Sequence, residues 1–241
     1  MLWGLQPVQQ QAAHGIVVAT LHQQIHSGLL LPDERLPAER KLADEMGISR
    51  VTLREALQVL EAERYIVIRR GSQGGAFVAA IDVLDDIARR RISLNPAKIM
   101  RALEYRHTLE PDIAALACER RGLPELKRME AALQELRQAT PSSAPGTAYR
   151  AVTLFRLALA AAAHNPFMLQ GLQLAMAELF LPHHLFADPD YHQPVCDHHQ
   201  QLLTAISQRD RNNALALVAN LIALDRTAIT ASLGTSSLSP L

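Results

Sequence analysis

The stretch PAERKLADEMGISRVTLREALQVLE (37–61) constrains the fold most, because it places two helical patterns on either side of one tight turn. The first pattern predicts a helix over 38–46, and Gly47 ends it since glycine accepts the left-handed backbone that such a turn requires. Ser49 can cap the start of the second helix, which we expect over about 50–64. Two short helices at this spacing indicate a helix-turn-helix.

The flanking residues extend this unit. Residues 12–28 carry apolar side chains at helical spacing and predict a helix before the turn. After Tyr65 the pattern changes to two short β-branched runs, 65–70 and 76–80, joined by the glycine-rich turn GSQGG. The order helix, helix, turn, helix and hairpin is typical of a winged helix-turn-helix.

From about residue 81 onward no strand is predicted. We expect a mainly α protein with a winged helix-turn-helix domain at 1–80, a linker with a short helix at 81–96, and an all-α antiparallel bundle at 97–241. The helices are expected at 82–92, 97–121, 123–139, 148–164, 165–181, 194–208 and 210–232. The segment PHHLFADPDYHQP is expected to be a loop.

Composition bounds the class of protein. The 241 residues are 49% hydrophobic, which is enough for a buried core, and Lys+Arg and Asp+Glu both total 24. No signal peptide is predicted, and no uninterrupted apolar run is long enough to span a bilayer. Two cysteines, Cys118 and Cys196, fit a reducing compartment. We therefore expect a soluble, cytoplasmic protein with no membrane partner.

The second helix of the turn motif begins with residues suited to double-stranded DNA. Arg50 and Arg54 stand one turn apart, and an arginine fork can pair with the O6 and N7 atoms of guanine. Ser49 and Thr52 can donate to phosphates, and Thr52 can also meet a base edge. Arg40, at the start of the preceding helix, can reach the DNA backbone.

The hairpin adds Arg69 and Arg70 beside Gly71, a combination suited to phosphates or a narrow minor groove. Residues 31–75 nevertheless hold eight Lys and Arg against eight Asp and Glu, so placement rather than bulk charge must direct binding. The acidic side chains are therefore expected to face away from DNA; they include Asp44, Glu45, Glu61 and Glu63.

The stretch LPAERKLADEMGISRVTLREALQVLEAERYIVIRRGSQGGAFV resembles the DNA-binding domain of the GntR superfamily of bacterial transcription regulators, and the match covers about 31–79. Val51 stands where relatives often have a small polar residue, which removes one contact. The resemblance implies DNA contacts from Arg40, Arg50, Thr52, Arg54 and the wing around Arg70 and Gly71.

Three later segments resemble the FadR-type effector domain called FCD: RALEYRHTLEPDIAALACERRG, LFRLALAAAAHNPFM and HHQQLLTAISQRDRNNALALV. The resemblance covers essentially all of 82–232 and implies an antiparallel helical bundle with a central small-molecule pocket, and a homodimer. We expect a regulator, and more specifically a repressor, whose operator affinity changes when an organic acid or acyl ligand binds in the bundle.

Many relatives bind a divalent metal with one Asp and three His, two of which come from a D-x-x-F-H pattern. Here that pattern has Val152 and Arg156 at the ligand positions, and the fourth ligand falls near Leu221. Only His199 matches, and one imidazole cannot hold a divalent ion. We therefore predict no metal and no cofactor. A second histidine site remains open as an alternative, made of His183, His184, His192, His198 and His199, although capping or solvated histidines are the simpler interpretation.

Arg156 also suggests a binding role. An arginine in a bundle core is costly unless it is paired or serves an anion, so Arg156 could bind a carboxylate effector or pair with Glu110 or Glu104. Arg106 lies one turn before Glu110 and could face the same pocket. The expected effector site is therefore Arg106, Arg156 and His199.

An enzyme is not predicted. The chain has no Gly-x-Ser-x-Gly elbow, P-loop, dinucleotide fingerprint or HExxH motif. Cys196 near His198 and His199 is a weak suggestion of a nucleophile. A helical enzyme or binding module with an accessory DNA-binding domain is the remaining alternative.

Overall fold

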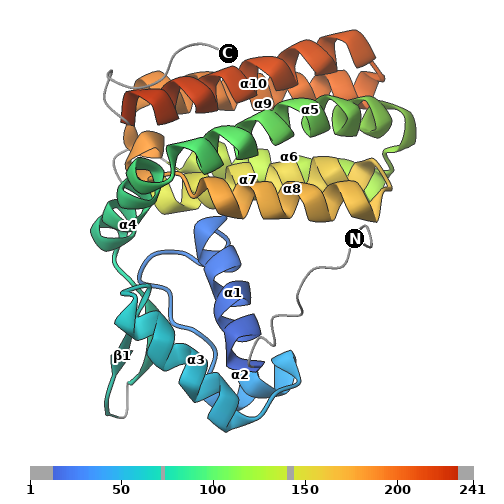
Figure 1. Cartoon of the computed structure of the whole chain (residues 1–241). Coiled ribbons are helices and arrows are strands. Elements are labelled where there is room, and N and C mark those ends of the chain that lie inside the picture. The colour runs from blue at the N-terminus through green and yellow to red at the C-terminus, as the bar shows by residue number, and fades with distance from the viewer. Residues whose placement is uncertain (1–12, 72–73, 140–143, 233–241) are drawn as a thin grey trace, which may run out of the picture.

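The computed structural model describes residues 13–71, 74–139 and 144–232 (Figure 1). The elements in order are α1 (Ala13–His26), α2 (Glu39–Met46), α3 (Arg50–Ala62), β1 (Ile66–Arg69), β2 (Gly75–Val78), α4 (Ile81–Leu94), α5 (Pro96–Arg120), α6 (Leu123–Gln138), α7 (Pro145–Ala162), α8 (Pro166–Leu179), the short 3-10 helix η1 (His183–Ala187), α9 (Pro189–Gln208) and α10 (Arg211–Ser232). The expected mainly α fold, a winged helix-turn-helix followed by a helical bundle, is confirmed.

The turn between α2 and α3 forms as the sequence predicts. Gly47 adopts the left-handed conformation with a φ of 66°, and its N–H bonds back to the carbonyls of Ala43 and Asp44. Ser49 caps α3, because its hydroxyl accepts a hydrogen bond from the backbone N–H of Thr52 at 3.0 Å. These two caps hold the start of α3 at a defined angle to α2.

The wing has one strand-like segment that the sequence did not indicate. β1 and β2 pair antiparallel, with Ile66 opposite Val78. The loop before α2 lies along the other edge of β2: Leu36 N–H donates to Ala76 O at 2.9 Å, and Val78 N–H donates to Glu34 O at 2.9 Å. The hairpin is therefore anchored on both sides, which limits its movement relative to α2 and α3.

The prediction of a loop at PHHLFADPDYHQP (182–194) is wrong. That segment contains η1 and the first turns of α9, which begins at Pro189 rather than at residue 194. Asp188 caps α9 by accepting from Asp190 N–H at 2.9 Å, and Pro189 occupies the first position, where a missing N–H is tolerated. Proline is unusual inside a helix, so Pro194 predicts a helix start, yet it lies within α9.

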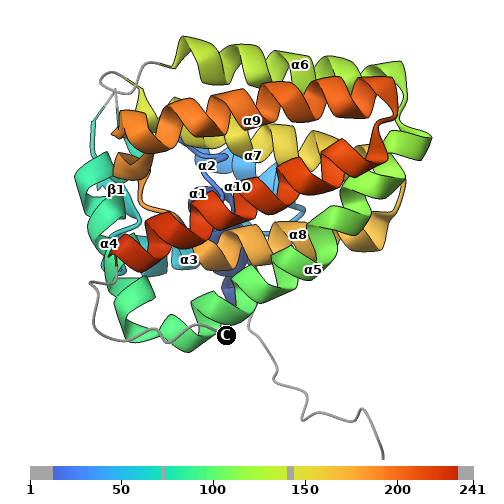
Figure 2. The same ribbon diagram turned by 90° about the horizontal axis from the view of Figure 1, so that it is seen from above.

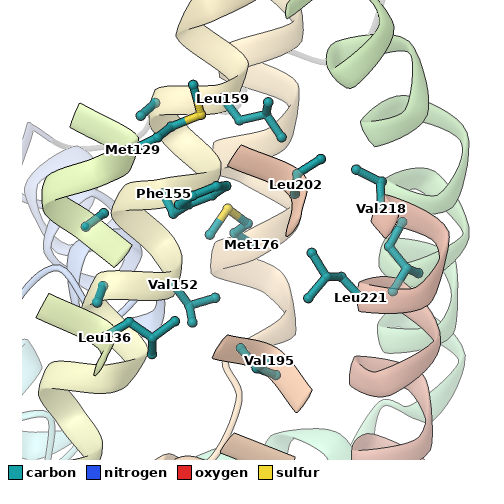
Figure 3. Packing of buried hydrophobic residues seen from close by; sticks show 14 of the residues in the cluster. Met129, Leu136, Val152, Phe155, Leu159, Met176, Val195, Leu202, Val218 and Leu221 are labelled. Atoms are coloured by element: carbon teal, nitrogen blue, oxygen red, sulfur yellow. The ribbon is translucent and has the colours of Figure 1, made fainter. Parts of the chain in front are cut away.

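The helices α5–α10 form one layered bundle around the larger of two apolar cores (Figures 2 and 3). α6 packs on α7, α5 packs on α8, and α10 packs on both α5 and α9. The smaller core lies beneath α1–α3, the hairpin and α4. Figure 1 shows α1 rising from this second unit to meet the bundle, where it contacts α8.

The two units share buried contacts. Tyr149 and Thr153 of α7 donate their hydroxyl hydrogens to the carbonyls of His26 and Ser27 at the end of α1, each at 2.6 Å. Phe180, just after α8, is 1% exposed and belongs to the smaller core, where its ring stacks on that of His26 at 4.4 Å between centroids. The bundle thus completes the core of the winged helix unit.

The prediction that no apolar run is long enough to span a bilayer does not hold for α10 by length and composition alone. Residues 211–231 are long and apolar enough, by length and composition alone, to cross a membrane, with a mean hydropathy of 1.5. Within the bundle, 39% of that stretch is buried, and its buried side chains include the carboxylate Asp225. A helix that packs along α5 and α9 passes the same test of length and composition as a membrane span.

Phe180→Ala should destabilise the winged helix unit although Phe180 belongs to the bundle segment. Truncating a buried phenylalanine costs about 3–5 kcal/mol, whereas Phe167→Ala, at a position that is 82% exposed, should change the unfolding free energy by no more than ~0.5 kcal/mol. Urea unfolding of both variants measures the difference. Equal midpoints for the two would show that Phe180 does not join the units.

Candidate nucleic-acid interface and effector site

A basic cavity lies where α2, α3 and the hairpin meet. It has a volume of about 390 Å³, and its walls are the start of α2, the start of α3 and the base of the wing. The expected DNA-contacting residues Arg40, Arg50 and Arg69 all line it, together with Arg35, which the sequence analysis missed. The fold therefore brings arginines from three separate elements to one concave surface.

The exposed face at the start of α3 carries Arg50 and Val51, and the Val51 side chain is 66% exposed. Arg54 donates from Nε to Oε2 of Glu39, the first residue of α2, at 2.7 Å. Thr52 and Ser49 share a hydrogen bond between their hydroxyls at 2.8 Å. Arg54 is thus tethered across the turn, while the exposed Arg50 at the start of the helix has no side-chain partner in the described part of the chain.

The wing residues lie at the other side of the same cavity. The Arg69 guanidinium lies over the Phe77 ring, 4.3 Å from its centroid, so stacking holds it near the base of the hairpin. Arg70 is exposed, and Gly71 has a φ of 105° with open space where a Cβ would be. Residues 72–73 of the predicted turn lie outside the described residues.

Several acidic side chains of this unit have partners within the protein. Glu63 pairs with His22 at 2.8 Å, Glu61 accepts from the backbone N–H of Ile68 at 3.0 Å, and Glu45 lies 3.6 Å from Lys41. Glu39, whose partnership with Arg54 the sequence did not indicate, is the acid that lines the basic cavity.

In the bundle, one buried carboxylate connects four helices. Asp225 of α10 accepts from Arg106 of α5 at 2.8 Å and from Arg156 of α7 at 2.9 Å, both at Oδ2. Its Oδ1 accepts from the hydroxyl of Tyr191 of α9 at 2.7 Å. Burial would raise the pKa of Asp225, but the charges of Arg156 and Arg106 and these hydrogen bonds hold that pKa below its usual value.

The expected pairing of Arg156 with Glu110 or Glu104 is wrong. Glu110 instead accepts from Nε of Arg106, and Glu104 is exposed. The partner of Arg156 is Asp225, far away in the sequence and brought near only by the packing of α10. Arg106 is 1% exposed and lies in the bundle interior.

His199 lies beside this cluster as a neutral ring. Burial and the nearby charge of Arg156 lower its pKa to about 3. Its Nδ1 is 2.7 Å from the carbonyl of Val195, which can only accept, so Nδ1 carries the proton and Nε2 has a free lone pair. In and beside this cluster, three buried nitrogens have no hydrogen-bond partner among the described residues: Nη2 of Arg106, Nε of Arg156 and Nε2 of His199.

These residues do not fit a metal. Val152 and Leu221, at two of the ligand positions that the resemblance implied, lie among the buried apolar side chains of the core (Figure 3). Arg156 stands at a third of these positions in the sequence, and its buried guanidinium is bound to Asp225. Among residues 13–71, 74–139 and 144–232, no three His, Cys, Asp or Glu side chains are grouped so that they could hold a metal ion.

The five late histidines belong to no described group of three or more His, Cys, Asp or Glu side chains that could hold a metal ion. Asp85 of α4 accepts hydrogen bonds from the backbone N–H groups of both His183 and His184, and its carboxylate oxygens lie within 3.0 Å of their rings. His198 bonds to Pro194 O at 2.7 Å. His192 lies 3.4 Å from the thiol of Cys196, and burial raises the pKa of that thiol to about 11. A thiol with that pKa is a poor nucleophile at neutral pH.

Comparison with known proteins agrees with this geometry. Residues 15–78 match the family described as bacterial regulatory proteins, gntR family, and residues 101–224 match the FCD domain. The chain therefore belongs to the GntR family, as a DNA-binding transcription regulator with a C-terminal FCD domain of the FadR type.

The galactonate operon transcriptional repressor of Escherichia coli strain K12 is 33% identical over 172 residues, which cover 68% of this chain and 72% of that protein. The Uxu operon transcriptional regulator of the same organism is 29% identical over 195 residues, covering 76% of this chain and 73% of the relative. The solved structure of E. coli McbR/YncC has the same fold, with a TM-score of 0.54 at 21% identity over 92% of this chain and 99% of that one. The relatives named here for operons are regulators, so the chain is a regulator rather than an enzyme.

Asp225→Ala should cost about 3–5 kcal/mol of unfolding free energy, because it leaves two buried guanidinium groups without their shared carboxylate. Asp112→Ala, which removes an exposed carboxylate from α5, is the matched control and should stay within ~0.5 kcal/mol of the wild type. Chemical denaturation monitored by circular dichroism separates the two. A mild effect at Asp225 would mean that the cluster is not what holds α10.

The neutral state of His199 predicts a pH dependence of stability. The unfolded ring takes up a proton below its ordinary pKa of 6.5, whereas the folded ring does so only near 3, so its contribution to stability is lost as the pH falls through that window. Between pH 6.5 and about 3, the unfolding free energy should fall less steeply with decreasing pH in His199→Gln than in the wild type. The difference in slope should be up to about 1.4 kcal/mol per pH unit. Urea unfolding at a series of pH values measures both slopes, and parallel slopes would contradict a buried neutral ring.

Proposed function

We propose that this protein is a cytoplasmic repressor that binds a short pseudo-palindromic operator as a homodimer and releases it when a small-molecule effector binds in the bundle. The observation that carries the proposal is the basic cavity, in which Arg40, Arg50 and Arg69 meet at the start of α3. The galactonate relative is itself named as a repressor, which supports the direction of regulation. A two-fold dimer would place two α3 helices in successive major-groove faces.

We propose three regions of the chain: an operator-binding domain at residues 1–80, a linker at 81–96, and a domain for effector binding and dimerisation at 97–241. Arg50 is the residue proposed to pair with a base, since it is exposed and none of the described carboxylates pairs with it. Arg54 approaches the same groove, while Glu39 restrains it. The remaining contacts would go to phosphates or the minor groove: Arg40, Ser49, Thr52, Arg69, Arg70 and Gly71.

Arg50→Ala should weaken operator binding by about 1–3 kcal/mol and relax base preference, because a lost base contact costs selectivity as well as affinity. Arg40→Ala should weaken all sequences more evenly, as expected for a phosphate contact. Selection of bound genomic fragments followed by fluorescence anisotropy measures both. Unchanged affinity and selectivity in Arg50→Ala would show that α3 does not bind DNA in the proposed orientation.

The proposed effector is a small hydroxylated carboxylate. Arg106 Nη2 and Arg156 Nε are buried N–H donors that require an acceptor, whereas His199 Nε2 is a buried lone pair that requires a donor. A hydroxy acid supplies both, through its carboxylate and its hydroxyl groups. The relative named for the galactonate operon supports this class, because galactonate is such an acid.

The proposed coupling runs along α7. Arg156 follows Thr153 by one turn on this helix, and Thr153 and Tyr149 hold the carbonyl end of α1. A ligand that shifts α7 would therefore move α1 and, through it, the helix-turn-helix. A second connection passes from η1 through Asp85 to the linker helix α4. Coupling free energies of this kind are about 1–3 kcal/mol.

Galactonate and related sugar acids should weaken operator binding by the wild type, and Arg156→Ala should abolish that response while leaving operator affinity intact. Anisotropy titrations of the operator complex with each acid measure the response. An unchanged response in Arg156→Ala would remove Arg156 from the effector site. Calorimetry showing equal effector affinity with and without operator would exclude the coupling itself, since linkage is reciprocal.

A further inference from the structure

Arg35 is held in place by the wing although it lies outside the helix-turn-helix. It forms an antiparallel bridge with Phe77 of β2, within the strand-like segment that precedes α2. Its guanidinium carbon lies 5.9 Å from the centroid of the Phe77 ring, and the Arg69 guanidinium approaches the same ring. The Phe77 ring therefore holds two guanidinium groups at the base of the hairpin.

A hydrogen bond fixes the Arg35 side chain further. Its Nη2 donates to the carbonyl of Gly74 at 2.5 Å. The next residue, Gly75, has a φ of 146°, and a Cβ added there would stand 3.1 Å from Nε of Arg35. A glycine at this position both accepts the backbone conformation and leaves room for the guanidinium. One of the five N–H donors of Arg35 is thus used to hold the hairpin, and the others remain available.

Charge around the cavity is unbalanced even though the unit as a whole is neutral. Within the part of the chain that the structure describes, Arg35, Arg40, Arg50 and Arg69 form no salt bridge with a carboxylate. The single acid in the wall, Glu39, is engaged by Arg54. The start of α2 also faces this cavity, and Ala38 at its N-cap supplies no side-chain acceptor for the first backbone N–H groups.

We infer that Arg35 is a DNA-contacting residue, which binds one backbone phosphate in the cavity between the wing and α2 while its bond to Gly74 positions the hairpin. A phosphate oxygen suits this place because free guanidinium N–H groups and the positive end of α2 converge there. The contact carries no sequence information and instead sets the angle at which the wing lies on the duplex. Arg35 thereby links the wing to the helix-turn-helix on the same DNA.

The test compares Arg35→Ala, Arg35→Lys and the control Arg101→Ala, which removes an exposed arginine of α5 far from the cavity. Binding of the full chain to a random-sequence duplex is measured by fluorescence anisotropy across a salt series, so the operator is not needed. Loss of one phosphate contact should reduce the slope of log affinity against log salt by about 0.9 and weaken binding on the order of tenfold at about 50 mM salt. Arg101→Ala should keep the wild-type slope.

Arg35→Lys separates the two roles, because lysine keeps the charge but cannot stack and fork as arginine does. It should retain most of the slope while losing affinity. A wild-type slope in Arg35→Ala, even with reduced affinity, would overturn the phosphate contact and leave Arg35 only a structural role. Unfolding midpoints of all three variants show whether the fold is intact. Failure of the wild type itself to bind with a salt slope would count against DNA binding as a whole, not against Arg35.

Discussion

The carboxylate of Asp225 is the interaction on which the bundle depends, because it lies on α10 and accepts hydrogen bonds from side chains of α5, α7 and α9. α10 is otherwise so apolar that packing alone would allow it to slide or rotate against α5 and α9. A buried ion cluster adds little net stability, since desolvation offsets much of the attraction, but it penalises every arrangement that separates its members. One charged residue thus selects the position of the last helix.

The same cluster connects α7 to α10, while other side chains of α7 connect it to α1. Tyr149, Thr153 and Arg156 follow one another at intervals of four and three residues, so they lie along one side of the helix. The first two hold α1 by its terminal carbonyls, and the third holds Asp225. Because all three are buried, α7 cannot move at one end without straining contacts at the other. A rigid helix with buried polar contacts at both ends therefore supports the coupling route proposed for α7.

The N-terminal unit was largely predictable from its sequence, and the polar core of the bundle was not. Gly47 and Ser49 act through backbone conformation and capping, which depend on neighbours only a few residues away. Asp225 pairs with Arg156, and Glu39 pairs with Arg54, only because tertiary packing brings them together. No local sequence pattern indicates such partners. The bond between Arg35 and Gly74 is of the same kind, because it requires the strand-like pairing beside β2.

A domain with equal numbers of acidic and basic residues can still present a strongly basic surface if its acids are paired elsewhere. Glu63 lies 2.8 Å from His22, Glu61 accepts from a strand N–H, and Glu39 restrains Arg54. Among the described residues, no carboxylate forms a salt bridge with the arginines that line the cavity. At long range the acidic and basic charges cancel, so the domain attracts nucleic acid only weakly. At short range the arginines of the cavity attract the phosphates directly. Binding then depends on fitting the cavity to the duplex, which favours a defined docking geometry over bulk electrostatic adhesion.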